Sequence, residues 1–258
     1  MKKFLKKYIP KYIVYGIKAV YCTLYSAIDY RLPFVVFFAK KSKWFININK
    51  NKIPVYYPSI AALEYYHKYI PVAGDVVYDV GGELGLEAEQ FSILTKKSGQ
   101  VHVFECLPTH IEGLKKLGNK YPQILLHEIA CWNKEEILEF HVGHTAGSGS
   151  AITDAKGQYG QSLANLDSIP LRVNARKLDD VWRENGAHHV NFMKMDIEGA
   201  EYEALEGAEI MLKHTSNVAI ASYHIRNGIP TAKKVEQILK NSGFETRIDK
   251  NLHVYGWR

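Results

Sequence analysis

The chain has 258 residues, of which 47% are hydrophobic and 23% charged. This composition is that of an ordinary globular protein and is long enough for one large domain with an extension. Residues 1–52 carry 12 Lys and Arg residues against a single acidic residue, Asp29, whereas the rest of the chain holds 21 basic and 26 acidic residues. An acidic remainder argues against nucleic acid as a partner, because phosphate contacts need a basic face near the active site.

The cysteines and histidines indicate neither a disulfide framework nor a metal site. Cys22, Cys106 and Cys131 are far apart and form no C-x-x-C pair, which favours reduced thiols in a cytoplasmic protein. No H-E-x-x-H motif occurs among the 11 histidines. His188 and His189 precede an expected strand, where neighbouring side chains point to opposite faces. We therefore predict no bound metal.

Residues 1–58 are predicted to form a basic, tyrosine-rich helical extension. Between Lys11 and Asp29, apolar side chains recur at helical spacing: Ile13, Ile17, Val20, Leu24 and Ile28. Lys18 interrupts this stretch, and the next apolar run, Leu32 to Ala39, has eight residues. Neither is expected to cross about 30 Å of hydrocarbon or to act as a signal peptide. Two interpretations remain: residues 1–52 lie on an anionic membrane surface, or the helix packs on the catalytic domain.

Residues 59–258 alternate strands and helices, which predicts a parallel α/β sheet. Ser59 is expected to cap a short helix, and Thr109 with Glu112 a capping box. Residues 143–168, rich in glycine and serine, are expected to form a functional loop. The expected strands are Asp75–Val80, Gln100–Glu105, Ile124–Ile129, Ile137–Val142, Ile169–Asn174, Val190–Asp196 and Asn217–His224. The expected helices include Leu86–Lys97, Gly199–Lys213 and Thr231–Asn241.

The chain ends with two β-rich runs, Glu245–Asp249 and Leu252–Trp257, separated by two residues. So short a connection requires an antiparallel pair, because parallel strands need a crossover of a dozen or more residues. A parallel sheet that ends in an antiparallel hairpin suits a methyltransferase better than a nicotinamide-dependent dehydrogenase.

A glycine-rich loop follows the first expected strand. The strand ends at Asp79, and Gly81, Gly82 and Gly85 form the turn into a helix, where glycine permits close approach of a ligand to the backbone. The open edge of such a sheet is where nucleotides bind. The dinucleotide fingerprint G-x-G-x-x-G would need glycine at position 80, which is valine.

Two further strand ends carry carboxylates. Glu105 ends the second strand, where a carboxylate can accept hydrogen bonds from ribose hydroxyls. Asp196, and with it Glu198, follows an apolar strand in the segment KMDIEGAE. These carboxylates are expected to converge with Asp79 on one crevice. The later glutamates are expected to lie on a solvated helix face: Glu201, Glu203, Glu206 and Glu209.

These segments resemble the FkbM family of methyltransferases, whose pattern is D-V-G-A-N-x-G, then F-E-P, L-D and K-x-D-x-E-G-A-E. Here they read DVGGELG (79–85), FEC (104–106), LDD (178–180) and KMDIEGAE (194–201), and the resemblance covers about residues 75–225. Glu83 replaces the usual asparagine and Cys106 the usual proline.

The resemblance implies a Rossmann-like, seven-stranded methyltransferase fold that binds S-adenosylmethionine. Asp79, Gly81 and Gly85 would hold the methionine part of the cofactor, Glu105 its ribose, and Ala130 would lie near adenine. Gly82, Glu83, Cys106 and Asp196 complete the expected cofactor contacts. Family members typically methylate hydroxyl oxygens of sugars or secondary metabolites, so the expected acceptor is a small molecule or a glycan.

Transfer to a hydroxyl requires that its proton be removed. His224 and Asp196 are the candidate bases, and a metal that lowers the acceptor pKa ranks behind them. Two other functions stay open from the sequence. One is a nicotinamide-dependent oxidoreductase, and the other is a non-catalytic, membrane-associated binding protein with the same fold.

Overall fold

A computed structural model describes residues 11–28, 35–40, 43–142, 151–152 and 169–258. The chain divides into two compact units, Met1–Ile70 and Pro71–Arg258. The division lies later than the boundary after residue 58 that the sequence suggested. Among the described residues, no helix has both the length and the apolar character needed to cross a membrane.

The first unit is a helix with a small antiparallel sheet. Helix α2 (Lys11–Ile28) confirms the helix expected there. It is followed by a sheet in the order β1-β2-β3, formed by β1 (Val36–Lys40), β2 (Lys43–Ile48) and β3 (Asn51–Val55). The 3-10 helix η1 (Ile60–Tyr66) then begins at Ser59, whose hydroxyl accepts a hydrogen bond from the Ala61 N–H. The expectation of a wholly helical extension is therefore wrong for the stretch from β1 to β3.

The turn between β2 and β3 explains this difference. Asn49 and Lys50 both have positive φ, 48° and 64°, as a two-residue hairpin turn requires. Neither is glycine, so the sequence carries no strong turn signal. Burial alternates along β2 and β3, and Ile46, Ile48 and Ile53 are fully buried.

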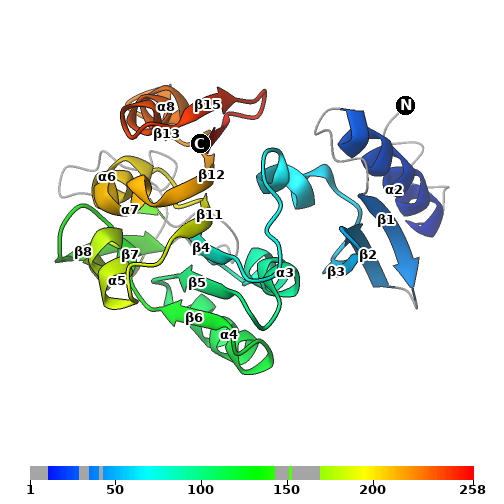
Figure 1. Ribbon diagram of the computed structural model, residues 1–258, viewed down its shortest axis with the longest axis horizontal. Helices are drawn as coiled ribbons and strands as arrows, with labels where there is room; N and C mark the ends of the chain where they lie inside the picture. Colours follow the sequence, from blue (N-terminus) through cyan, green and yellow to red (C-terminus); the bar gives the residue numbers. More distant parts are fainter. Residues whose placement is uncertain (1–10, 29–34, 41–42, 143–150, 153–168) are drawn as a thin grey trace. The chain divides into compact units, whose positions relative to one another are not determined.

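The second unit contains a seven-stranded sheet in the order β15-β16-β12-β11-β4-β5-β6 (Figure 1). The five strands from β12 to β6 run parallel, and β16 pairs antiparallel with both β12 and β15. This confirms the predicted Rossmann-like fold with its C-terminal hairpin. The strands are β4 (Val76–Val80), β5 (Gln100–Phe104), β6 (Ile124–His127), β11 (Val190–Met195), β12 (Thr215–Ala221), β15 (Glu245–Ile248) and β16 (His253–Trp257).

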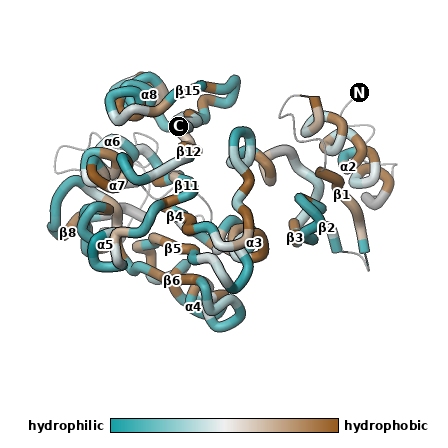
Figure 2. The backbone as a smooth tube through the Cα atoms, in the orientation of Figure 1, coloured by the Kyte–Doolittle hydropathy of each residue, from teal (hydrophilic) through white to brown (hydrophobic). Residues whose placement is uncertain are grey.

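The central strands form the apolar core of this unit. Brown, hydrophobic segments recur along β4 and β5 in Figure 2. Val77, Val101, Met193 and Ile220 are fully buried. Near-continuous apolar runs are typical of parallel strands that are covered on both faces. The charged residues Asp79 and Lys194 lie near the carboxyl ends of β4 and β11.

Within the described part of this unit, six helices accompany the sheet: α3 (Leu86–Thr95), α4 (Pro108–Lys120), α5 (Leu178–Glu184), α6 (Glu201–Glu206), α7 (Glu209–Lys213) and α8 (Ala232–Asn241). Helix α4 begins one residue before Thr109, with Leu107 at its N-cap, so the predicted capping box is wrong. Proline is favoured at the first helical position, where no N–H is needed. Glu112 instead forms an ion pair with Lys116, with Oε1 and Nζ 2.7 Å apart.

The single helix expected over Gly199–Lys213 is two helices, α6 and α7. A Cβ atom at Gly207 would lie 2.0 Å from the backbone oxygen of Trp132, so the chain passes directly against that residue. The N–H groups of Ile210 and Met211 donate to the Asp179 carboxylate at the start of α7. The aspartate of the L-D motif is therefore a structural cap.

A second, smaller sheet has the order β7-β10-β8-β9. Its strands are β7 (Ala130–Cys131), β8 (Glu136–Val142), β9 (Ala151–Ile152) and β10 (Ile169–Arg176), and β10 pairs antiparallel with β8. The strands expected at 137–142 and 169–174 are thus present but do not join the central sheet. Apart from β9, the loop expected over residues 143–168 lies outside the described residues.

Candidate active site

A buried ion pair joins the carboxyl ends of the two central strands. Asp79 on β4 and Lys194 on β11 are partners in the parallel register, and Lys194 Nζ lies 3.0 Å from Asp79 Oδ1. Their side chains are 0% and 4% exposed. Lys194 Nζ also donates to the backbone oxygen of Gly81. Burial opposes the charge on Lys194, but Asp79, Glu87 and Asp196 together raise its pKa above the ordinary value.

The glycines that follow Asp79 let the loop lie directly against the neighbouring strand ends. A Cβ atom at Gly81 would lie 1.9 Å from the backbone oxygen of Asp196, and one at Gly82 would lie 2.3 Å from a methyl group of Val103. Gly81 and Gly85 have φ of 84° and 81°, in the left-handed region that favours glycine. Glycine is therefore required here by the packing of the loop itself, and the close approach of a ligand stays a prediction.

Glu105 fixes this loop from the end of β5. Its carboxylate accepts hydrogen bonds from the backbone N–H groups of Glu83, Cys106 and Leu107, at 2.8–2.9 Å. His110 Nδ1 lies 3.6 Å from Oε2. Burial raises the pKa of Glu105, but His110 and the backbone N–H groups outweigh it, so the net pKa is lowered. Glu105 is thus an ionised acceptor, and a carboxylate with about four lone-pair sites retains capacity for a further hydroxyl donor.

Cys106 and Ala130, both predicted cofactor contacts, share one apolar cluster. Ala130 lies on β7 with 6% exposure, and Cys106 packs against the cluster that contains Ala130 and Trp132. Burial raises the pKa of the Cys106 thiol to about 12, so the thiol is neutral and apolar in character. The cluster offers an apolar wall beside the loop that follows Glu105.

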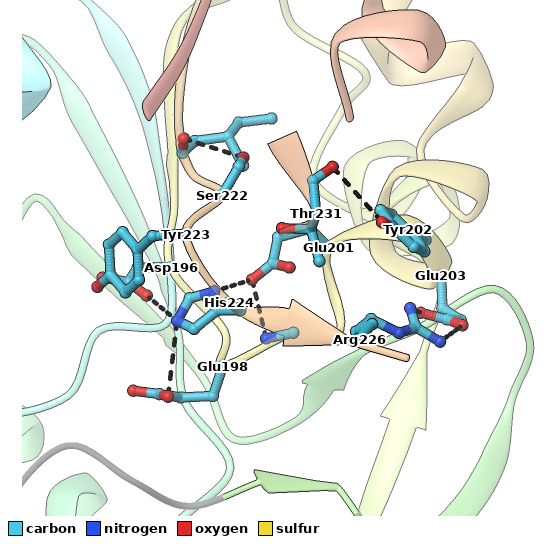
Figure 3. A network of polar contacts seen from close by, with 12 residues as sticks. Asp196, Glu198, Glu201, Tyr202, Glu203, Ser222, Tyr223, His224, Arg226 and Thr231 are labelled. Atoms are coloured by element: carbon cyan, nitrogen blue, oxygen red, sulfur yellow. Dashed lines mark hydrogen bonds and ion pairs between the residues drawn. The ribbon is translucent and has the colours of Figure 1, made fainter. Parts of the chain in front are cut away.

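A second set of polar side chains lies at the end of β11. We call Asp196, Glu198 and His224 the polar cluster. His224 Nε2 lies 3.5 Å from Asp196 Oδ1 and 3.5 Å from Glu198 Oε2, as Figure 3 shows. Tyr223 donates its hydroxyl to Asp196 Oδ2 at 3.2 Å. The two predicted bases, His224 and Asp196, are thus brought together, and Glu198 joins them.

Glu201 corrects the expectation of a solvated helix face. Its side chain is fully buried and accepts a hydrogen bond from the Gly199 N–H at 3.0 Å. Oε1 also lies 2.9 Å from His224 Nδ1 (Figure 3). Glu203 is half-buried and pairs with Arg226 through two hydrogen bonds. Glu206 and Glu209 are exposed, as expected.

His224 lies beyond the end of β12, which stops at Ala221, and not on the strand as expected. It is held by a small hairpin, β13 (Ile225–Arg226) with β14 (Ile229–Pro230). The Thr231 N–H closes this hairpin by donating to the His224 backbone oxygen at 2.9 Å. Burial lowers the pKa of His224, but its three carboxylate neighbours outweigh that effect and raise it.

The polar cluster brings metal-ligand types together although the sequence predicts no metal. One ligand atom from each of Asp196, Glu198 and His224 lies within 4.8 Å of the others. Several acidic groups also create a negative field here: burial raises the pKa of Glu198, His224 lowers it, and Asp196, Glu201 and Glu83 raise it. Such a field attracts cationic ligands.

Comparison with known proteins identifies the family. Residues 79–246 match the FkbM methyltransferase domain. The chain belongs to the FkbM methyltransferase family. It is 27% identical over 148 residues to the 2-O-methyltransferase NoeI of Sinorhizobium fredii. The matched region covers 54% of this chain and 60% of NoeI. The chain is also 24% identical over 241 residues to the AMB antimetabolite synthetase AmbE of Pseudomonas aeruginosa, covering 81% of this chain and 11% of AmbE.

The fold agrees with this assignment. The crystal structure of an FkbM methyltransferase from Methylobacillus flagellatus KT superposes with a TM-score of 0.51 at 17% identity, covering 76% of this chain and 47% of that one. The chain thus spans about half to three fifths of the lengths of NoeI and this crystallised methyltransferase.

The cofactor of the family is S-adenosylmethionine, and the residues present fit it. Glu105 is an ionised carboxylate with an acceptor position left, the cluster around Ala130 offers an apolar surface, and the carboxylates after β11 suit the sulfonium and ammonium groups. Lys194 and Glu201 are site residues that the sequence does not predict. Both stand in the motif KMDIEGAE, but only the strand register and the burial of α6 reveal what they contact.

Replacing Glu105 tests the predicted ribose contact. Glu105→Ala is expected to weaken S-adenosylmethionine binding by about 1.5–3 kcal/mol, or about 10–150-fold, the typical contribution of hydrogen bonds to a charged group. Isothermal titration measures the affinity, and circular dichroism confirms folding. Glu112→Ala, on the exposed side of α4, is the matched control and should bind like wild type. An unchanged dissociation constant in folded Glu105→Ala removes this residue from the cofactor site.

Proposed function

We propose that the protein transfers the methyl group of S-adenosylmethionine to a hydroxyl oxygen of a sugar, glycan or glycolipid. The observation that carries the proposal is the junction of the cofactor loop with the polar cluster. Gly81 packs directly on the backbone of Asp196, so an acceptor bound at the cluster lies beside the loop. The similarity to NoeI, a 2-O-methyltransferase, supports oxygen as the acceptor atom.

When bound, S-adenosylmethionine supplies an electrophilic methyl group. The residues of this chain have two tasks, alignment of the acceptor and removal of its proton, and alignment supplies much of the rate of such a displacement. Glu105 and Lys194 fix the loop on either side. The polar cluster acts on the hydroxyl proton, because it is where His224 and Asp196 converge.

Two alternative functions can be distinguished from methyl transfer by whether S-adenosylmethionine is consumed. Membership in the FkbM family and the valine at position 80 both count against a nicotinamide-dependent oxidoreductase. A non-catalytic binding protein would bind S-adenosylmethionine but would not consume it. The cluster of titratable side chains beside the loop favours catalysis, because titratable groups with shifted pKa values gather at catalytic sites.

The test is methyl transfer from unlabelled S-adenosylmethionine to a panel of monosaccharides, oligosaccharides and glycolipids, with amine and thiol acceptors in parallel. A 14-dalton increment by mass spectrometry and a methoxy signal by NMR are the expected results. His224→Ala should lower kcat by about 10²–10⁴-fold with cofactor affinity nearly unchanged. Glu206→Gln, an exposed carboxylate on the same helix as Glu201, should behave as wild type. Methylation of amines or thiols alone, or binding without turnover, contradicts the proposal.

A further inference from the structure

We infer that the polar cluster of Asp196, Glu198 and His224 binds a divalent metal cation. The distances of 3.5 Å from His224 Nε2 to each carboxylate oxygen are longer than the 2.7–3.2 Å of ordinary hydrogen bonds. Ligands about 2.1 Å from a tetrahedral metal lie about 3.4 Å from one another. The spacing therefore matches ligands around a common cation better than direct hydrogen bonds.

The orientation of the His224 imidazole also supports a bound cation. His224 Nδ1 is directed at Glu201, 2.9 Å away, which leaves Nε2 turned toward the two carboxylates (Figure 3). The His224 side chain is 9% exposed, and Nε2 has no hydrogen-bond partner among the described residues. With the proton on Nδ1, a buried lone pair would face two negative oxygens. A proton on Nε2 or a cation between the three groups removes this repulsion, and the 3.5 Å distances, longer than ordinary hydrogen bonds, favour the cation.

Glu201 contacts the other ring nitrogen of His224, Nδ1. Histidines that bind metals usually donate their other ring N–H to a carboxylate, which fixes the ring and raises its basicity as a ligand. Glu201 is fully buried and is itself held by the Gly199 N–H. Glu198 has φ of 56°, a left-handed conformation that a glutamate adopts at a cost and that here accompanies its approach to His224.

The ligand set defines the class of cation and its use. One imidazole nitrogen and two carboxylate oxygens suit Mn²⁺ or Zn²⁺. Three protein ligands leave a coordination position open, as catalytic sites do. The role that follows rests on the proposed function: the cation binds the acceptor hydroxyl and lowers its pKa. The hydroxyl proton leaves to solvent, the oxygen bonds the methyl carbon, and the electron pair of the broken C–S bond stays on sulfur.

The experiment is a Mn²⁺ titration of the untagged, full-length chain after dialysis against EDTA, followed by the electron paramagnetic resonance signal of free Mn²⁺. One equivalent should bind. Glu198→Gln and Asp196→Asn should each weaken binding at least tenfold, and Glu201→Gln by about 10–100-fold. Glu206→Gln is the control and should bind like wild type. Thermal unfolding without metal confirms that each variant is folded, and two independent ligand variants cover the failure of one to fold.

Equal Mn²⁺ binding by wild type and both ligand variants overturns the site. Methyl transfer that persists unchanged in EDTA overturns the role of the cation but leaves the proposed function intact. Specific binding of one equivalent without transfer to any hydroxyl overturns the proposed function but leaves the site. The two failures are therefore distinguishable.

A separate observation concerns helix α2 in the first unit. One of its faces is apolar and exposed, with exposed fractions of 42–74% at Ile13, Ile17, Val20, Tyr21, Leu24 and Ile28. Ala19, Cys22 and Ser26, on the other side, are buried. Contiguous apolar surface of this kind marks an interaction site. Brown segments recur along α2 in Figure 2.

The structure assigns this apolar face to an anionic membrane surface. Charge complementarity selects the partner, because residues 1–52 hold 12 Lys and Arg residues against Asp29 alone. Lys18 on α2, Lys40 and Lys43 on the sheet, and Lys50 in the turn between β2 and β3 are exposed. An apolar helix face in a lysine-rich segment is typical of helices that lie in the headgroup region, where each basic residue contributes about 1 kcal/mol.

Sedimentation with vesicles tests this assignment, using phosphatidylcholine alone or with 30% phosphatidylglycerol. The full chain should pellet with the anionic vesicles and be released by salt. Ile17→Ser with Leu24→Ser should reduce binding at least tenfold, whereas Ile137→Ser, an equally exposed isoleucine on β8, should not. Equal pelleting of all variants, or none by wild type, overturns the assignment. If the double variant melts at a lower temperature than wild type when no vesicles are present, the face is internal packing. This result also overturns the assignment.

Discussion

The buried ion pair between Asp79 and Lys194 is the interaction on which the site depends. Taking two charges out of water costs several kcal/mol per ion, so such a pair persists only with good geometry and further hydrogen bonds. Here the parallel register places the two residues side by side, and the ammonium also binds the Gly81 carbonyl. The pair thus joins β4, β11 and the cofactor loop at one point.

The cofactor loop and the polar cluster both contact the carboxyl end of β11 next to this ion pair. Asp196 follows Lys194 by two residues, and its N–H donates to the Val80 carbonyl, so it continues the contact between the strands. Its backbone then supports Gly81, while its side chain belongs to the polar cluster. The cofactor loop and the cluster are therefore held in register by one strand end. A shift of β11 would displace both together.

The sequence predicts the parts of this arrangement that depend on local pattern. Apolar runs that end in glycine or a carboxylate identify β4, β5 and β11, and the short final connection requires the antiparallel hairpin. Asp79, Glu105 and Asp196 are recognisable because each stands at the end of such a run. Parallel strands bring their carboxyl ends together, so the convergence also follows from the sequence.

The sequence does not predict contacts that depend on tertiary packing. Glu201 has the polarity and spacing of a solvated helix face, and only the position of α6 against the His224 segment buries it. Lys194 lies inside an apolar strand, and its partner is set by the register with β4. The break before α7 depends on the approach of Gly207 to Trp132, more than 70 residues away in sequence.

The most direct test of this account is a double-mutant cycle on the buried pair, with Asp79→Leu, Lys194→Met and their combination. The free energy of unfolding comes from urea titration and the cofactor affinity from calorimetry. Each single variant should lose about 3–5 kcal/mol, because it leaves one buried charge uncompensated. The combination should recover much of that stability yet bind S-adenosylmethionine weakly, since the tie to Gly81 is lost. Wild-type stability and cofactor affinity in Lys194→Met would contradict the account.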